Sequence, residues 1–207
     1  MINKIYNDDC MNIMKNMPDN YIDLAIVDPP YGVNIEKRKD INASKNKKWD
    51  IEIPDKKYFD ELFRISQKQI IWGMNRFLDY LPNCNMTIIW DKENGNNYVS
   101  DYELAWCNVG YNRNRIYKQF WISNMIDKNE KPRIHPAQKP FKLYMWLLQN
   151  YAKPGDLILD THSGSGSCAI ACMLEGFDFI AIEKDYDYWK VSVERFETEK
   201  SQLKLFT

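Results

Sequence analysis

Residues 24–31 read LAIVDPPY, and this stretch decides the fold class. Its four leading apolar residues predict a short buried β-strand. The residues that follow, from Asp28 to Tyr31, therefore stand at the carboxyl end of that strand. Open α/β sheets bind their ligands outside the carboxyl ends of their strands. The stretch thus predicts an α/β protein with a ligand site next to Asp28.

The four residues after the strand combine one acceptor, two prolines and one aromatic ring. Pro29 and Pro30 have no N–H group and a fixed φ, so they stiffen the turn and leave carbonyl oxygens as its backbone polar groups. Asp28 adds a carboxylate, and Tyr31 adds a flat ring. This set suits a planar group with an exocyclic amino group, such as adenine or cytosine. Taken alone, the tetrapeptide is equally typical of a strand that ends in a proline turn.

A second strand is followed by a glycine-rich loop. Residues 156–160 read DLILD, and residues 164–169 read GSGSCA, which fits the pattern G-x-G-x-x-A. The glycines allow a tight turn and close approach of a ligand, and the small last residue lets a helix pack on the strand. Glu183 ends the next predicted strand, about twenty residues downstream, where a carboxylate can accept hydrogen bonds from both hydroxyls of a ribose. The unit predicts a cofactor that contains a nucleoside; a glycine-rich structural turn is the alternative.

The charge at this edge of the sheet distinguishes between two nucleoside cofactors. Asp28, Asp160 and Glu183 all end predicted strands. A pyrophosphate is repelled by three carboxylates, whereas a sulfonium group and an α-amino group carry positive charges that carboxylates stabilise. S-adenosylmethionine is therefore preferred to NAD.

Strands and helices alternate along the rest of the chain. Seven strands are predicted, at residues 21–27, 69–73, 86–91, 102–109, 115–121, 156–160 and 179–183. Helices are predicted at residues 58–68, 74–81, 140–153, 167–174 and 186–200. This alternation predicts an α/β fold with a doubly wound, mostly parallel sheet of the Rossmann-like kind. Residues 102–109 and 115–121 are expected to form an antiparallel hairpin at its edge, and residues 1–207 a single domain.

Composition limits the class of protein. The 207 residues carry a net charge of −1 and five cysteines. An odd number of cysteines without a C-x-x-C pair argues against a disulfide framework and against a zinc site, so no metal is expected. No apolar run of about 18 residues and no signal-peptide core is present. The chain is therefore predicted to be cytoplasmic, without a membrane segment.

Two stretches are rich in basic residues. Residues 32–57 form a long polar segment that is predicted to be a mobile loop, and the stretch from Tyr111 to Lys142 has eight basic and two acidic residues with interleaved aromatic rings. Basic and aromatic residues together favour a nucleic-acid surface, although such runs are by default simply solvated. The candidate contacts are Lys37, Arg38, Lys39, Arg113, Arg115, Lys118, Lys131 and Arg133.

Motifs along nearly the whole chain resemble the amino-methyltransferases of DNA, in the β-type order in which D-P-P-Y precedes the cofactor loop. The similar segments are residues 6–10 (YNDDC), 17–24 (MPDNYIDL), 89–92 (IWDK), 135–140 (HPAQKP) and 160–167 (DTHSGSGS). The last segment resembles D-x-F-x-G-S-G-[ST], and His162 departs from it because the family usually has Phe at that position. The resemblance implies a permuted class I methyltransferase fold that transfers a methyl group from S-adenosylmethionine to DNA.

The resemblance also implies roles for individual residues. The catalytic residues are expected to be Asp28, Pro29, Pro30 and Tyr31. The cofactor-binding residues are expected to be Asp9, Cys10, Asp28, Lys139, Asp160, His162, Gly164, Ser165, Gly166, Ser167 and Glu183. Among these, Asp9 and Cys10 are expected near the adenine of the cofactor, Glu183 at its ribose, and Asp160 with the glycine loop at its methionine part.

The proposed reaction follows from these roles. The target base in double-stranded DNA is flipped out of the stack, because its amino group is not accessible there. Tyr31 stacks on the base, while the Asp28 carboxylate and the Pro29 carbonyl accept hydrogen bonds from the amino hydrogens. The nitrogen lone pair then attacks the sulfonium methyl group in line. Loop 32–57 is expected to face the DNA.

The target and the partners are less closely specified. Adenine N6 is preferred to cytosine N4, because the family's cytosine members more often have Ser at the position of Asp28. The interval at residues 122–134 holds only a vestige of the family's target-recognition insert, so a homodimer is expected to compensate, and a cognate restriction endonuclease is a further candidate partner. Two readings from other classes are a catalytically degenerate DNA-binding module and an NAD-dependent oxidoreductase.

Overall fold

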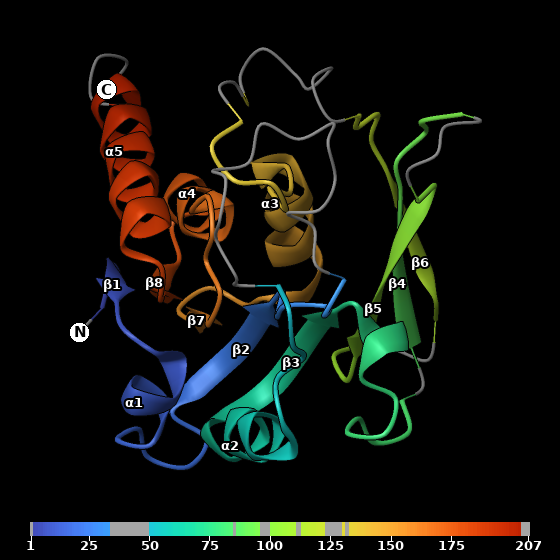
Figure 1. Cartoon of the computed structure of the whole chain (residues 1–207). Coiled ribbons are helices and arrows are strands. Elements are labelled where there is room, and N and C mark those ends of the chain that lie inside the picture. Colours follow the sequence, from blue (N-terminus) through green and yellow to red (C-terminus); the bar gives the residue numbers. More distant parts are fainter. Residues whose placement is uncertain are drawn as a thin grey trace.

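One mixed sheet carries the described part of the chain. The computed structural model describes residues 2–33, 50–84, 86–95, 100–110, 113–122, 130 and 133–203. Within them, eight strands pair in the order β1-β8-β7-β2-β3-β5-β4-β6 (Figure 1). The strands are β1 (Lys4–Asn7), β2 (Ile22–Val27), β3 (Ser66–Trp72), β4 (Met86–Asp91), β5 (Tyr102–Cys107), β6 (Arg115–Lys118), β7 (Leu157–Asp160) and β8 (Asp178–Glu183).

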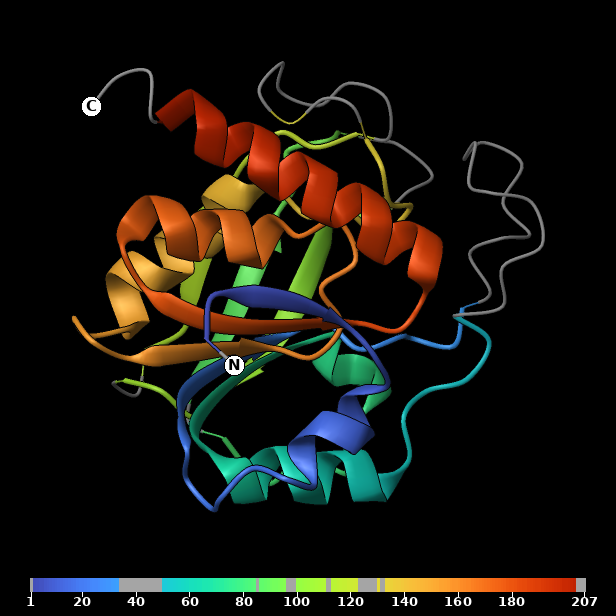
Figure 2. The same cartoon turned by 90° about the vertical axis from the view of Figure 1, so that its left-hand side faces the viewer.

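Helices cover both faces of this sheet. They are α1 (Cys10–Met14), α2 (Lys56–Ile65), the short 3₁₀-helix η2 (Met74–Arg76), α3 (Phe141–Tyr151), α4 (Ser167–Glu175) and α5 (Tyr186–Leu203). Helices α3, α4 and α5 lie on one face, and α1 and α2 lie on the other (Figure 2). The predicted α/β class with a doubly wound, mostly parallel sheet is therefore confirmed.

Two details of the predicted sheet are wrong. Strand β1 was not expected, because Ile5 is its one buried residue and no apolar run marks it. The sheet consequently has eight strands and not seven. In addition, β5 and β6 do not form an edge hairpin: β5 lies between β3 and β4 and runs antiparallel to both, while β6 pairs with β4 in parallel. The last three residues of β5 are buried, which fits a strand that lies between two others.

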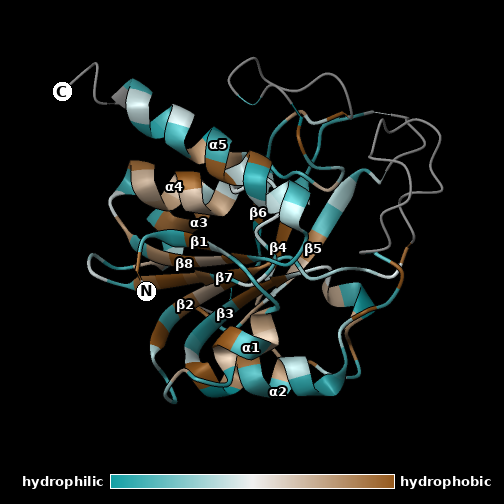
Figure 3. Cartoon of the chain, turned by 60° about the vertical axis from the view of Figure 1, so that its left-hand side comes forward, coloured by the Kyte–Doolittle hydropathy of each residue, from teal (hydrophilic) through white to brown (hydrophobic). Residues whose placement is uncertain are grey.

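The sheet is apolar on both faces because both are covered. In β2 the last four residues, Leu24 to Val27, are all completely buried. On one side, α2 contributes Phe59 and Leu62 to the core. On the other, small buried side chains let α4 approach the sheet, and its Cys168 and Cys172 are free thiols. Figure 3 shows brown stretches along the strands inside the sheet, a mainly tan and brown α4, and teal on the exposed turns of α5.

The start of helix α2 shows that the predicted end of the polar segment 32–57 is wrong by two residues. Asp55 caps it, since the Asp55 side chain accepts a hydrogen bond from the backbone N–H of Tyr58. Helix α2 begins at Lys56, so the polar segment expected at residues 32–57 ends two residues earlier. Among the described residues, no helix combines the length and apolar character needed to cross a membrane.

The parallel strands bring the predicted site residues to one edge. Asp28 follows β2, Asp160 ends β7 and Glu183 ends β8. Because β2, β7 and β8 are parallel neighbours in the sheet, these three carboxyl groups lie on the same edge. Strand β5 runs the other way, so its first residues, and not its last, reach this edge.

Candidate active site

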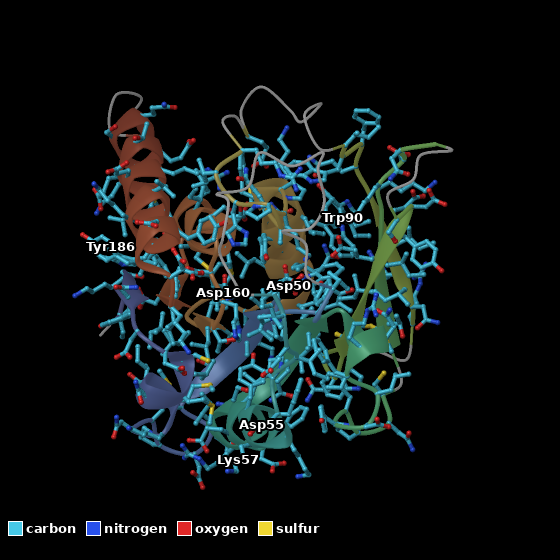
Figure 4. The ribbon with its side chains drawn as sticks, in the orientation of Figure 1. Asp50, Asp55, Lys57, Trp90, Asp160 and Tyr186 are labelled. Atoms are coloured by element: carbon cyan, nitrogen blue, oxygen red, sulfur yellow. The ribbon has the colours of Figure 1, made fainter. Side chains whose placement is uncertain are left out.

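A cavity of about 710 Å³ lies at this edge of the sheet. The predicted site residues that line it are Asp9, Cys10, Asp28, Pro30, Lys139, His162, Gly164, Ser165, Ser167 and Glu183. Pro29, Tyr31, Asp160 and Gly166 are not among the residues that line it. In Figure 4, Asp160 and Asp50 lie near the centre, Tyr186 lies at the start of α5, and Trp90 lies on β4. The cavity is long enough to join the D-P-P-Y turn to the glycine loop.

Glu183 is held at one end of the cavity by backbone groups. Its Oε2 accepts a hydrogen bond of 2.8 Å from the Gly164 N–H, and its Oε1 accepts one of 2.8 Å from the Asp185 N–H. These bonds fix both oxygens of a carboxylate that also lines the cavity. A fixed carboxylate of this kind can accept hydrogen bonds from vicinal hydroxyl groups; the ribose contact stays a prediction.

The glycine loop is held from behind by helix α5. Gly166 precedes α4 with a φ of 74°, a conformation that favours glycine. The Arg195 guanidinium donates hydrogen bonds of 3.0 Å to the Ser165 carbonyl and to the Ser167 hydroxyl. Arg195 also forms an ion pair of 2.9 Å with the fully buried Glu130. Sequence reasoning missed Arg195 because its contacts with the glycine loop and Glu130 exist only in the folded chain.

Asp160 and His162 carry little charge at neutral pH. Burial, with a further contribution from the charges of Asp28 and Glu183, raises the pKa of Asp160 to about 8, although the His162 N–H donates to its carboxylate. Burial lowers the pKa of His162 to about 4, so its imidazole is neutral. The ring packs edge-on against Tyr58 at 5.3 Å. The neutral imidazole therefore packs as an uncharged aromatic ring against Tyr58.

Asp9 and Cys10 line the cavity at the start of α1. The Asp9 side chain caps this helix through the Met11 N–H at 2.9 Å, and it forms an ion pair of 2.8 Å with Lys184. The hydrogen bond from Lys184 lowers the pKa of Asp9. Burial raises the pKa of Cys10 to about 12, which keeps it a neutral thiol. Asp9 thus gives the cavity a carboxylate that is paired with a lysine, and Cys10 gives it a neutral, largely apolar side chain.

At the other end of the cavity, Asp28 is bound by two donors. The Lys139 ammonium forms an ion pair with Oδ2 of Asp28, and the Tyr31 hydroxyl donates to Oδ1 at 2.5 Å. Lys139 was expected to hold the cofactor; its ammonium lies at the D-P-P-Y turn, 3.2 Å from the Tyr31 hydroxyl. Burial raises the pKa of Asp28, against the opposing charge of Lys139.

Glu103, at the start of β5, is a further member of this group that sequence reasoning missed. Its Oε2 lies 2.9 Å from the Lys139 ammonium, and its Oε1 lies 2.7 Å from Lys92. Burial alone would raise the pKa of Glu103, but the charges of the two lysines outweigh it and lower the pKa to about 2. The sequence offered one signal for Glu103, since it is an acidic residue at the start of a predicted antiparallel strand. The predicted hairpin placed that strand at the edge of the sheet, away from the site.

Tyr31 is fixed by its backbone and by its ring. Its N–H and that of Gly32 donate to Oδ1 of the buried Asp50, at 2.8 and 3.1 Å. Its ring packs edge-on against Phe77 at 6.2 Å. The ring also lies directly on Gly73, where an added Cβ would be 2.2 Å from a ring carbon. Asp50 and Gly73 thus place the ring, and neither was predicted.

The described basic candidates lie in two places, three of them at β6 and Arg133 beside His135. Arg115 and Lys118 lie on β6, where Arg115 contacts Asn150 and the Trp146 ring and Lys118 pairs with Asp91. Arg113 is exposed just before β6. Arg133 donates to the carbonyl oxygens of His135 and Pro136. Lys37, Arg38, Lys39 and Lys131 lie outside the described residues, as do most of segments 32–57 and 122–134.

The chain is similar to known methyltransferases. The profile of the N6/N4 DNA methylase family matches residues 65–194. The type II methyltransferase M.HinfI of Haemophilus influenzae is 24% identical over 249 residues, which cover 96% of this chain and 69% of M.HinfI. The M1.HpyAVI–SAM complex is 22% identical with a TM-score of 0.62, covering 93% of this chain and 98% of that one. PvuII DNA methyltransferase (cytosine-N4-specific) is 14% identical with a TM-score of 0.63, covering 96% and 90%.

Replacing Gly73 with Ala tests the placement of Tyr31. Gly73 has a φ of 75°, and its new Cβ would collide with the Tyr31 ring, so we expect the free energy of unfolding to fall by about 2–4 kcal/mol. Urea denaturation measures this loss. Gly95→Ala is the matched control, because Gly95 has a φ of 63° but no atom within 4 Å of the added Cβ. Equal losses in the two variants would contradict the contact.

Proposed function

The chain belongs to the N6/N4 DNA methylase family, and on this basis we propose that it transfers a methyl group from S-adenosylmethionine to the N6 amino group of adenine in DNA. One observation carries the proposal. A single cavity has the Asp28 carboxylate at one end and the fixed Glu183 carboxylate with the glycine loop at the other. A nucleoside cofactor and an amino-bearing base can therefore meet inside it.

The cofactor end of the cavity fits S-adenosylmethionine. Glu183 would accept hydrogen bonds from the ribose hydroxyls, and Asp9 and Cys10 would lie near the adenine. Asp160, Gly164 and Ser167 would surround the methionine part. Asp160 is mainly protonated at neutral pH, and a cationic ligand beside it would favour its ionised form. When bound, the cofactor supplies an electrophilic methyl group on a sulfonium.

The D-P-P-Y end of the cavity fits an exocyclic amino group. The Asp28 carboxylate and the Pro29 carbonyl would accept the two amino hydrogens, which withdraws the nitrogen lone pair from the ring of the base. Pro29 and Pro30 keep this turn rigid because their φ angles are fixed. Positioning and hydrogen bonding of this kind supply the acceleration. The base must leave the duplex to reach Asp28, since the amino group is enclosed in the stack.

Cytosine N4 is the second candidate target. Its amino group presents the same two hydrogens to the same acceptors, and the cytosine-specific PvuII enzyme has a similar fold. Asp28 favours adenine, because the related cytosine enzymes more often have Ser at this position. Methylation of a bacterial genomic DNA, followed by mass spectrometry of its nucleosides, separates the two. N6-methyldeoxyadenosine is the expected product, and N4-methyldeoxycytidine would overturn the choice of base.

The DNA contacts and partners are part of the same proposal. Arg113, Arg115 and Lys118 line the β6 side of the molecule and are proposed to contact phosphates, together with Lys37, Arg38, Lys39, Lys131 and Arg133. The segment 122–134 is short for target recognition, which favours a homodimer that shares the DNA. A restriction endonuclease with the same target is the proposed partner. Phosphate contacts of this kind would make DNA binding fall steeply with salt.

Replacing Asp28 tests the catalytic end. We expect Asp28→Ala to lower the rate of methyl transfer by at least about a hundredfold, because the amino group loses its charged acceptor. Affinity for S-adenosylmethionine, measured by calorimetry, should change little. Asp28→Asn keeps the shape and one acceptor oxygen, and should retain more activity than the alanine variant. Transfer at the unaltered rate in Asp28→Ala would contradict the role of this carboxylate.

The pKa of Asp160 predicts a pH dependence of cofactor binding. Asp160 is protonated in the free protein below its pKa of about 8, and the cationic cofactor favours the ionised form, so binding releases a proton. Affinity should therefore rise with pH between 5.5 and 7.5, by up to about tenfold per unit, while the cofactor's α-amino group stays charged. Calorimetry in buffers of different ionisation enthalpy measures the proton release. Asp160→Asn should show none, and equal release in both proteins would contradict the assignment.

The neutral state of His162 predicts that a phenyl ring can replace it. We expect His162→Phe to bind S-adenosylmethionine as tightly as the unaltered chain, since the buried imidazole carries no charge above its pKa of about 4. The variant loses the contact between His162 Nδ1 and the Thr161 hydroxyl, which is 2.9 Å long. Thermal stability measured with the binding assay separates this loss from an effect on the cofactor. A large fall in affinity with unchanged stability would contradict the interpretation.

A further inference from the structure

Four charged side chains of alternating sign lead from the β4–β5 side of the sheet to the D-P-P-Y turn. Lys92 contacts Oε1 of Glu103 at 2.7 Å, and Lys139 contacts Oε2 of Glu103 at 2.9 Å. Lys139 also contacts Asp28, so the ammonium lies between two carboxylates. The Lys139 side chain is 3% exposed, and that of Asp28 is 12% exposed. The buried Lys139 ammonium is therefore stabilised by the two carboxylates beside it, and each carboxylate is stabilised by the ammonium.

Glu103 reaches this place because β5 runs against its neighbours. In the sheet register Glu103 lies opposite Trp90 of β4, and Ala105 lies opposite Trp72 of β3. The start of β5 is thus at the edge where β3 and β4 end. A parallel strand would have placed the same residue at the opposite edge of the sheet.

The two oxygens of Asp28 are both occupied by donors of the protein itself. Lys139 takes one oxygen, and the Tyr31 hydroxyl takes the other. An amino group on a target base needs Asp28 as its acceptor, so it competes with these two donors for the same carboxylate. Lys139 cannot move into water, because its side chain is buried and its ammonium lies 5.5 Å from the ring centres of both Trp72 and Tyr31. It requires a second anion within the protein.

We propose that Glu103 is the positioning residue that receives Lys139 and the Tyr31 hydroxyl when the target amino group binds to Asp28. The inference rests on the proposed function. Both donors are already next to Oε2 of Glu103, the ammonium at 2.9 Å and the hydroxyl at 3.3 Å. The exchange replaces hydrogen bonds and moves no proton, so every group keeps its charge.

Lys92 prepares Glu103 for this exchange. It occupies Oε1 of Glu103 and so leaves Oε2 to accept the two donors. Lys92 also lies over the Trp90 ring, 5.0 Å from its centre, which holds its side chain in place. Against the effect of burial, the charges of Lys139 and Lys92 lower the pKa of Glu103 to about 2, so the carboxylate is ionised at neutral pH. The receiving anion is thus present before the base arrives.

A structural role for Glu103 makes a different prediction. A simple counter-ion of Lys139 would affect the stability of the fold, and the rate of transfer in folded protein would stay near that of the unaltered chain. If Glu103 instead receives Lys139, its loss leaves the ammonium bound to Asp28 and blocks the acceptor. Removing Lys139 as well then frees Asp28, so the double change restores activity that the single change removes.

The experiment compares Glu103→Gln, Lys139→Met and the double variant. Single-turnover transfer from labelled S-adenosylmethionine to unmethylated bacterial genomic DNA is measured with excess protein. We expect Glu103→Gln to slow transfer by about ten- to a hundredfold, with affinity for S-adenosylmethionine within about threefold of the unaltered chain. The double variant should transfer faster than Glu103→Gln alone. Asp101→Asn, an exposed acid two residues away, is the matched control and should leave the rate unchanged.

Each outcome bears on the inference. Transfer by folded Glu103→Gln at the unaltered rate overturns the role of Glu103 and leaves the proposed function standing. A double variant whose loss of transfer rate equals the product of the two single losses also overturns the role of Glu103 and leaves the proposed function standing. Absence of transfer by the unaltered chain overturns the proposed function together with the inference. If Glu103→Gln does not fold, Glu103→Asp replaces it: its shorter carboxylate keeps the charge, and slower transfer that Lys139→Met restores is again the expected result.

Discussion

A buried ammonium and a buried carboxylate meet at the end of β2, where Lys139 pairs with Asp28. Removing one member of such a pair costs roughly 3–5 kcal/mol, because the remaining charge is left in a medium of low polarity. The two residues come from segments 111 positions apart, so the fold must bring residues 133–140 against the end of β2 to satisfy either charge. Glu103 adds a third distant segment to the same point. The geometry of the turn therefore depends on the correct assembly of the whole sheet.

Three carboxyl groups at one edge of a sheet would repel one another, and the structure treats each of them differently. Asp28 is neutralised by a lysine, and Glu183 is stabilised by two backbone N–H groups. Asp160 accepts one backbone N–H, that of His162, which does not offset its burial, so it keeps its proton near neutral pH. Because protonation is reversible, Asp160 is the acid that can respond to a cationic ligand. This edge of the sheet can therefore bind a positive charge next to Asp160. Before such a ligand binds, it does not carry three unpaired negative charges.

The sequence was sufficient for the features that rest on local patterns. The apolar run before Asp28 and the strand–glycine loop–helix unit placed both ends of the cavity correctly, because parallel strands with hydrophobic faces converge at one edge. It was insufficient for β1, whose single buried residue gives no pattern, and for the central position of β5, which depends on pairing between distant strands. Glu103 and Arg195 were missed for the same reason: each acts through a contact that only the tertiary structure creates. Asp50 and Gly73 were missed although they lie close in sequence to recognised elements, since neither has an unusual local context.

The contact between Asp50 and the D-P-P-Y turn makes the geometry of the turn independent of the residues between 33 and 50. Asp50 stands 19 residues after Tyr31, yet its carboxylate accepts hydrogen bonds from the N–H groups of Tyr31 and Gly32. The chain therefore leaves the site at residue 33 and returns to it at residue 50, and the two ends are tied together. Two hydrogen bonds to a charged acceptor are stronger than neutral ones, so the turn is held whether or not anything binds to the intervening residues. A segment anchored in this way can differ in length and composition without displacing Asp28, which suits the DNA-facing role proposed for residues 32–57.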